Sequence, residues 1–114
     1  ILLVTSRGTG RWIVPKGWPI EGLDSPATAL QEAWEEAGVR CGKPSLKPLG
    51  SYHYEKGLPG DWSVPVTTIV YPVRVLELSS EYPESDQRTR KWVSPSEAAE
   101  LVDEPELKEL LAFF

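Results

Sequence analysis

The sequence has few of the residues that stabilise extracellular proteins or form membrane spans. Its 114 residues contain one cysteine, Cys41, one histidine, His53, and no methionine. A single cysteine excludes an internal disulfide and a cysteine-rich metal site. No run approaches the roughly 20 apolar residues of a membrane helix, and no signal peptide is visible. We therefore expect a reduced, cytoplasmic protein that does not bind a membrane.

Positive charge is also scarce, with 12 Lys and Arg residues against 17 Asp and Glu residues and a formal net charge of −5. Such a balance argues against nucleic acid and anionic membranes as partners. It does not exclude a small phosphorylated substrate, because metal ions neutralise phosphate groups. The length and the hydrophobic content of 40% fit one domain with one core over residues 1–114.

No Lys or Arg occurs between Lys16 and Arg40, and an acidic helix is predicted within this gap. Ser25 suits the N-cap and Pro26 the first helical position. Gly38 suits the left-handed residue that follows a helix. The sequence therefore predicts a helix that begins near residue 25 and ends before residue 38.

Three carboxylates crowd one face of this helix. Glu32, Glu35 and Glu36 stand at i, i+3 and i+4, and a like-charge i,i+4 pair costs an isolated helix a few tenths of a kcal/mol. The apolar stripe that contains Leu30 and Trp34 points the other way, so we expect the carboxylates to face outward. A divalent cation such as Mg²⁺ or Mn²⁺ would convert the repulsion into a binding site. The alternative is a solvated acidic face.

The stretch from residue 17 to residue 39 resembles the signature of the Nudix hydrolases, G-x5-E-x7-R-E-U-x-E-E-x-G-U, in which U is a bulky aliphatic residue. The residues that match it are Gly17, Glu32, Glu35, Glu36, Gly38 and Val39. The resemblance implies an α/β fold, namely an α/β/α sandwich with a mixed β-sheet. It also implies hydrolysis of a phosphoanhydride with Mg²⁺ or Mn²⁺ as cofactor, and the family includes homodimers.

The match has three departures. Leu23 replaces the first Glu of the signature, Gln31 replaces the Arg, and Ala33 replaces the first aliphatic residue. Loss of the Glu and the Arg together leaves no orphan ion, and Glu21 is a candidate substitute. Two other readings remain open. One is a catalytically silent Nudix-fold module that binds a nucleotide or another phosphorylated ligand, and the other is a plain interaction domain.

The resemblance also implies roles for the residues of the signature. Glu32 and Glu36 would hold the divalent cation with the backbone carbonyl of Lys16. Glu35 would be the catalytic base that takes the proton of the attacking water, although the roles within the trio vary across the family. An acid outside the signature would complete the site, and the candidates are Glu55, Glu81, Glu84 and Asp86.

Basic residues near the signature are candidates for substrate binding, because Arg suits bidentate contacts with phosphate. These candidates are Arg7, Arg11, Lys16, Arg88 and Arg90. The alternative for each is a solvated surface charge. Residues 7 and 11–15 resemble the approach to the signature in diphosphoinositol polyphosphate phosphohydrolases, which act on inositol pyrophosphates and dinucleoside polyphosphates. Lys16 stands where that branch more often has Gly, so the substrate stays open.

The rest of the chain predicts a scaffold. The chain opens within a strand at residues 1–4, and we expect a strand to precede it. Further strands are expected at 11–14, 46–54, 64–78 and 88–93, with a turn at 56–61, a polar loop at 79–87, and helices at 95–102 and 107–114. Tyr52 and Tyr54 should face away from His53, for which packing or contact with the substrate edge is favoured over catalysis. Trp18 and Trp62 lie in loops and could stack on a base or cover the core.

Overall fold

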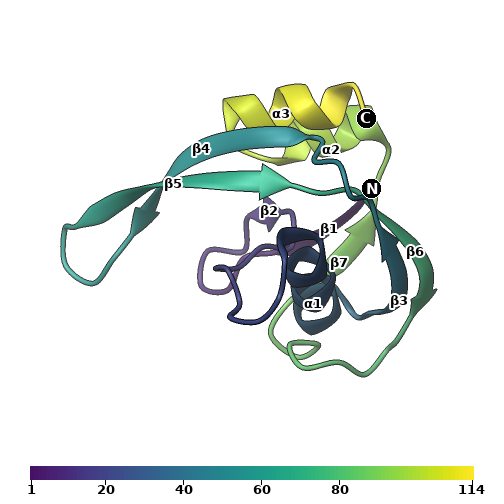
Figure 1. The fold of residues 1–114 in the computed structure, drawn as a ribbon. Coiled ribbons are helices and arrows are strands. Elements are labelled where there is room, and N and C mark those ends of the chain that lie inside the picture. The colour runs from purple at the N-terminus through teal and green to yellow at the C-terminus, as the bar shows by residue number, and fades with distance from the viewer.

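The structure is a computed structural model that describes residues 1–114 (Figure 1). In chain order the elements are β1 (Leu2–Thr5), β2 (Trp12–Ile13), α1 (Ser25–Ala37), β3 (Val39–Pro44), β4 (Gly50–Gly57), β5 (Ser63–Val70), β6 (Val73–Leu78), β7 (Arg90–Trp92), α2 (Pro95–Leu101) and α3 (Pro105–Ala112). The predicted α/β class is confirmed.

The strands form three small sheets. β1 lies between β2 and β7, β3 pairs with β6, and β4 pairs with β5. Every one of these pairs is antiparallel, so the sequence expectation of one mixed sheet is replaced by separate antiparallel sheets. The β4–β5 pair is a long hairpin that arches away from the body of the molecule in Figure 1.

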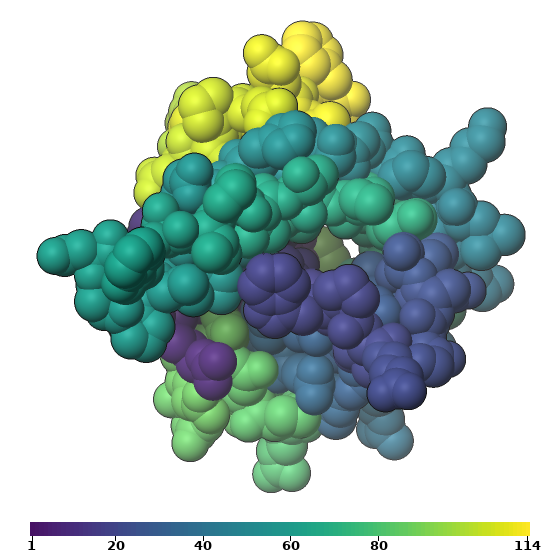
Figure 2. Space-filling model, turned by 60° about the vertical axis from the view of Figure 1, so that its left-hand side comes forward, coloured from purple at the N-terminus to yellow at the C-terminus, as the bar shows by residue number.

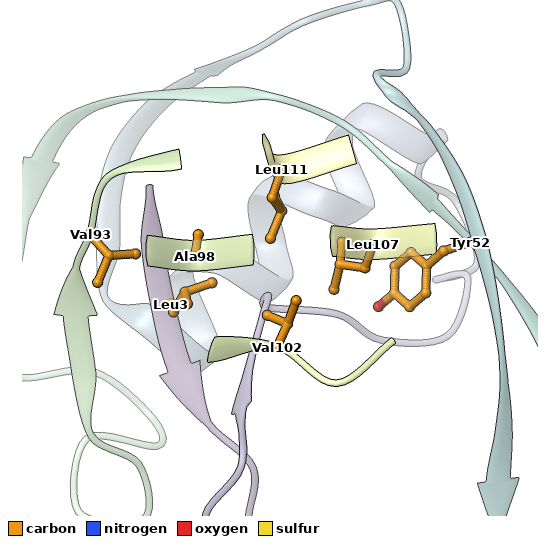
Figure 3. Close-up of a cluster of buried hydrophobic side chains, with 7 residues drawn as sticks. All are labelled: Leu3, Tyr52, Val93, Ala98, Val102, Leu107 and Leu111. Carbon is orange, nitrogen blue, oxygen red and sulfur yellow. The ribbon is translucent and has the colours of Figure 1, made fainter. Parts of the chain in front are cut away.

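Two hydrophobic clusters lie on opposite faces of β1, because successive side chains of a strand point to opposite sides. Leu3 belongs to a cluster under α2 and α3 that also contains Tyr52, Leu107 and Leu111 (Figure 3). Val4 belongs to a second cluster with residues of α1 and β3. The short sheet around β1 is thus covered by α1 on one side and by α2 and α3 on the other, which is the predicted α/β/α layering.

The ends of α1 are set by its flanking residues. The side chain of Asp24 accepts a hydrogen bond of 2.9 Å from the Ala27 amide, so Asp24 is the N-cap and the predicted cap, Ser25, is the first helical residue. Gly38 has φ 73°, the left-handed conformation predicted for it, and a Cβ there would meet Tyr82 and Arg90. Both ends therefore hold the acidic helix in a fixed position beside the sheet.

Most of the other expected elements are present with shifted ends. β3 was not predicted, because Arg40, Gly42 and Lys43 interrupt any apolar alternation, and it forms through its pairing with β6. The β-rich stretch 64–78 is divided at Tyr71 and Pro72 into β5 and β6. Ser94 caps α2 by accepting a hydrogen bond from the Glu97 amide, as predicted, whereas α3 begins at residue 105.

None of the three helices combines the length and the apolar composition that crossing a membrane would require.

Candidate active site

A cavity of about 1040 Å³ lies between α1, the segment before α1 (residues 14–24) and the β4–β5 hairpin. Figure 2 shows this hollow between the blue-purple segment before α1 and the teal strands of the hairpin. Glu32 and Glu36 line it from the helix, and Lys16 and Tyr54 line it from the other side. The cavity therefore brings together the acidic signature and residues far from it in the sequence.

The acidic helix does not present all of its carboxylates to solvent. Glu36 is buried, with 3% of its surface exposed, which corrects the expectation that the trio faces outward. The segment before α1 and the loop that carries Glu84 and Arg88 cover this face, and sequence periodicity does not register such covering segments. The burial makes Glu36 part of the floor of the cavity.

Glu32 and Glu36 lie one turn apart on α1, and their carboxyl groups influence each other's pKa. Burial, followed by the contact with Glu32, raises the pKa of Glu36 to about 8. Burial is also the main cause of the raised pKa of Glu32. Two carboxyl groups this close disfavour double ionisation, and one shared proton relieves the repulsion. A bound divalent cation would also relieve this repulsion, and its charge is twice that of a proton.

Arg88 connects the acidic pair to a further carboxylate. Its side chain is 8% exposed, and its Nη2 lies 3.5 Å from Oε1 of Glu36. Its Nε donates a 3.0 Å hydrogen bond to Glu84, and its Nη1 donates one of 3.0 Å to the carbonyl of Thr5. Of the four acids proposed outside the signature, Glu84 is thus the one that reaches the cavity. Arg88 thus contacts two carboxylates, Glu36 and Glu84, at the edge of the acidic pair.

Glycine is required at position 17 because the Glu32 carboxylate lies directly against it. A Cβ at position 17 would overlap the carboxyl carbon and oxygens of Glu32, although the backbone of Gly17 has no positive φ. The chain therefore passes directly against this carboxylate. Lys16, which precedes Gly17, lines the same cavity.

The donor set fits a hard divalent cation. Glu32 and Glu36 line the cavity with carboxylate oxygens, and together with the backbone carbonyl of Lys16 they would form the hard oxygen ligand set that Mg²⁺ and Mn²⁺ prefer. No group of three or more acidic, histidine or cysteine side chains has a metal-binding arrangement, and the carboxylates that α1 brings to the cavity are the pair Glu32 and Glu36.

Glu35 occupies a different position from its two neighbours. Its side chain does not line the cavity, and its backbone carbonyl accepts a 3.0 Å hydrogen bond from the Glu84 amide. The charge of Glu35 nevertheless contributes to the raised pKa of Glu32, although less than burial does. Of the predicted trio, the structure brings Glu32 and Glu36 into the cavity and leaves Glu35 at its border.

The predicted substrate-binding arginines divide into two groups. Arg7 and Arg88 line the cavity, and Arg7 lies 3.5 Å from Glu84. Arg90 instead donates two 2.8 Å hydrogen bonds to the carbonyls of Ala37 and Ser79, which stabilises the end of α1. Arg90 therefore has a structural role in place of the expected contact with substrate.

Arg11 also lies away from the cavity. Its Nη1 is 3.2 Å from both Asp103 and Glu104. Glu104 is buried, and its Oε2 has no hydrogen-bond partner. The positive charge of Arg11 thus serves to compensate a buried carboxylate at the junction of α2 and α3.

This position yields a stability prediction. Arg11→Ala should lower the free energy of unfolding by about 1–3 kcal/mol, because it leaves the Glu104 carboxylate buried without a counter-charge. Turnover per folded molecule should be unchanged. Urea unfolding beside the control Asp103→Asn, which removes only an exposed partner, checks the prediction. A selective loss of substrate affinity with normal stability would return Arg11 to the substrate site.

The wall opposite the acidic pair carries alternating lysines and aromatic rings. Lys16 Nζ donates a 3.0 Å hydrogen bond to the Tyr54 hydroxyl and lies 4.6 Å from the centre of that ring. Lys56 Nζ lies 5.9 Å from the ring centre of Trp18. All four residues line the cavity, whereas Trp62, the other loop tryptophan, does not.

His53 lies outside the cavity. It is exposed on β4, and its Nδ1 is 3.0 Å from the Glu106 carboxylate of α3. Tyr52 is buried and Tyr54 half-buried on the opposite side of the strand, as their alternation predicted. The structure therefore gives His53 a packing contact between β4 and α3.

Sequence reasoning did not identify Tyr54 and Lys56 as residues of the site. Both lie on the inward face of β4, and this face meets the segment before α1 only through the tertiary structure. Tyr54 and Lys56 are two residues apart, as are Lys16 and Trp18. This equal spacing would identify the contacting pairs only if the two segments were already known to lie side by side.

Comparison with known proteins agrees with the geometry. The family model described as NUDIX domain matches residues 1–114. The chain is 36% identical over 120 residues to Nudix hydrolase 21, chloroplastic, of Arabidopsis thaliana, covering 100% of this chain and 56% of that protein. It is 32% identical over 114 residues to Nudix hydrolase 16, mitochondrial, of the same plant, covering 97% of this chain and 62% of that protein.

A third relative has a more specific name. The chain is 29% identical over 112 residues to the asymmetrical bis(5'-nucleosyl)-tetraphosphatase of Sus scrofa, covering 97% of this chain and 74% of that protein. The chain belongs to the Nudix domain family. It spans little more than half the length of the first two relatives, and none of the three is named for diphosphoinositol substrates.

Proposed function

We propose that this domain is a pyrophosphohydrolase that cleaves a phosphoanhydride with the help of Mg²⁺ or Mn²⁺. The substrate is a small phosphorylated molecule of one of three classes. These are a nucleoside diphosphate linked to another group, a dinucleoside polyphosphate, and an inositol pyrophosphate. The observation that carries the proposal is the acidic pair Glu32 and Glu36, of which Glu36 is buried, in one cavity with Arg7, Arg88 and Lys16. Acidic and basic groups on one cavity suit a metal-bound phosphate chain.

Glu32 and Glu36 would hold the cation, together with the carbonyl of Lys16. When bound, the cation neutralises phosphate charge and lowers the pKa of the attacking water. Arg88 holds Glu36 and Glu84 in place through its three contacts and adds positive charge beside the phosphates. Arg7, whose side chain is 59% exposed, contacts Glu84 and Gln87 at the cavity and would place a second positive charge near the phosphates. Charge that develops on the leaving phosphate is then met by fixed cationic groups.

The catalytic base is the role that two arguments assign differently. The family resemblance favours Glu35, but of Glu32 and Glu35 only Glu32 lines the cavity, and a base must reach the attacking water. In that second assignment Glu32 would be the base in place of a ligand, and Glu36 would hold the cation. Glu32→Gln and Glu35→Gln separate the two assignments. Replacement of the base lowers kcat and preserves metal affinity, whereas replacement of a ligand weakens metal binding.

A phosphate-release screen tests the proposed activity. The panel contains a diadenosine polyphosphate, a nucleoside triphosphate, a nucleotide sugar and an inositol pyrophosphate, each with Mg²⁺ and with Mn²⁺. We expect turnover of one substrate class that chelation of the metal reduces at least about 100-fold, because the cation supplies most of the charge neutralisation. Turnover that persists in chelator would contradict the proposal.

A catalytically silent binding module is the second candidate. It is favoured by Leu23 and Gln31, both exposed, which leave the signature without its first Glu and its Arg. Ligand binding without phosphate release across the whole panel would support it. The expected cytoplasmic location and the homodimer are further proposals, and the two plant relatives carry chloroplastic and mitochondrial in their names.

A further inference from the structure

The segment before α1 and strand β4 present their side chains to each other in register across the cavity. Lys16 contacts Tyr54, and two residues further along both segments Trp18 faces Lys56. The two pairs therefore form one row of alternating positive and aromatic groups. The row starts beside Gly17, which touches the Glu32 carboxylate, and continues toward the β4–β5 turn.

The inner pair of this row is already engaged, and the outer pair is open. Lys16 and Tyr54 are half-buried and hydrogen-bonded to each other. Trp18 is 58% exposed, and Lys56 Nζ lies over its ring, 5.9 Å from the ring centre. A tryptophan that served only to fill the core would bury most of its surface. Trp18 instead offers an open ring face at the edge of the cavity.

We propose that Trp18 is the stacking platform for the nucleobase of the substrate and that Lys56 contacts a phosphate beside it. This inference rests on the proposed function and specifies its substrate as a nucleoside or dinucleoside polyphosphate. The reactive phosphoanhydride lies at Glu32 and Glu36, the phosphate chain follows Lys16 and Lys56, and the base covers Trp18. An inositol pyrophosphate has no aromatic group and gains nothing from Trp18.

The chain supplies a matched control for the platform. Trp62 is also an exposed loop tryptophan, with 76% of its surface accessible, and it does not line the cavity. Trp18→Ala and Trp62→Ala thus remove the same side chain from two surface loops. Trp18→Phe keeps an aromatic face, and Trp18→Leu keeps apolar bulk without one.

The first measurement compares a substrate with a base and one without a base. With diadenosine tetraphosphate and Mg²⁺, Trp18→Ala should lower kcat/KM between about 5-fold and 100-fold, mainly through KM, which is the range of a lost base–aromatic stack. With inorganic tripolyphosphate, Trp18→Ala should change kcat/KM less than about 2-fold. Trp18→Phe should restore most of the loss, and Trp62→Ala should behave as wild type with both substrates.

The second measurement requires no turnover. Calorimetric titration of ADP with Mg²⁺ into the same proteins should show weaker binding to Trp18→Ala and Trp18→Leu than to wild type and Trp62→Ala. Equal ADP affinity in all variants, or an equal effect of Trp18→Ala on both hydrolysed substrates, overturns the platform even if the enzyme is active. Loss of ADP binding in Trp18→Ala without any hydrolysis by wild type supports the platform and rejects the proposed activity.

Discussion

Glu36→Gln is expected to lower kcat/KM at least about 100-fold and to make the metal-free protein more stable above neutral pH. The activity falls because the substitution removes one negative ligand from the pair that holds the cation. The fold survives because Gln has nearly the shape of Glu, and Arg88 keeps its contacts with Glu84 and Thr5. Loss of activity and gain of stability would then come from the same change.

The sign of the stability effect follows from the raised pKa of Glu36. Its pKa is about 8 in the folded protein and near 4.5 in the unfolded chain. Between these values the unfolded chain releases the proton and the folded protein keeps it, so stability falls as pH rises, by up to about 1.4 kcal/mol per pH unit. Gln does not titrate, so the variant should lose this slope.

Thermal unfolding in chelator at pH 5 and at pH 9 measures this effect, and phosphate release measures activity. Glu100→Gln, an exposed substitution on α2, is the control and should match wild type in both assays. Near-native turnover by Glu36→Gln would remove Glu36 from the metal site. A variant with the same pH slope as wild type would show that another group causes the slope.

Gly17→Ala is expected to lower activity roughly 10-fold to 100-fold with little loss of stability. A Cβ at this position would push the Glu32 carboxylate away from its place beside Glu36. Glu32 is a flexible side chain and Gly17 has no positive φ, so the backbone can accept alanine. The substitution should therefore displace the side chain of Glu32, a proposed metal ligand, without straining the backbone.

Gly57→Ala is the matched control for this prediction. Gly57 lies at the end of β4, has no positive φ, and a Cβ there would have no neighbour within 4 Å. The Mg²⁺ concentration that gives half-maximal activity should rise in Gly17→Ala and stay unchanged in Gly57→Ala. An unchanged metal requirement in both variants would mean that the contact between Gly17 and Glu32 does not position a ligand.

The local elements of the fold could be predicted from sequence because their signals are local. The Gly38 cap, the Ser94 cap and the alternation of Tyr52, His53 and Tyr54 depend only on neighbouring residues, and all three are confirmed. β3 could not be predicted, because it exists through pairing with β6 and has no apolar pattern of its own. Sequence spacing likewise does not specify which strands share a sheet.

In the candidate site, too, features that depend on local spacing were predicted and features that depend on tertiary contacts were not. The spacing of Glu32 and Glu36 placed them on one helix face, and the resemblance to the signature assigned them to a cation site with the carbonyl of Lys16. Burial of Glu36 depends on the loop that carries Glu84 and Arg88, about fifty residues later in the chain, and no local pattern contains that contact. Arg11 and Arg90 were proposed as substrate contacts, but in the structure Arg11 contacts Asp103 and Glu104 and Arg90 contacts the carbonyls of Ala37 and Ser79, and no local pattern in the sequence contains these contacts.

The most direct test of the account is a calorimetric titration of Mn²⁺ into wild type and Glu36→Gln at pH 7, in two buffers with different ionisation enthalpies. We expect wild type to bind Mn²⁺ and to release about one proton per ion, because the cation displaces the proton that burial keeps on Glu36 at this pH. Glu36→Gln should bind more weakly and release less. Absence of Mn²⁺ binding to wild type, or equal affinity and proton release in the two proteins, would contradict a metal site on this pair.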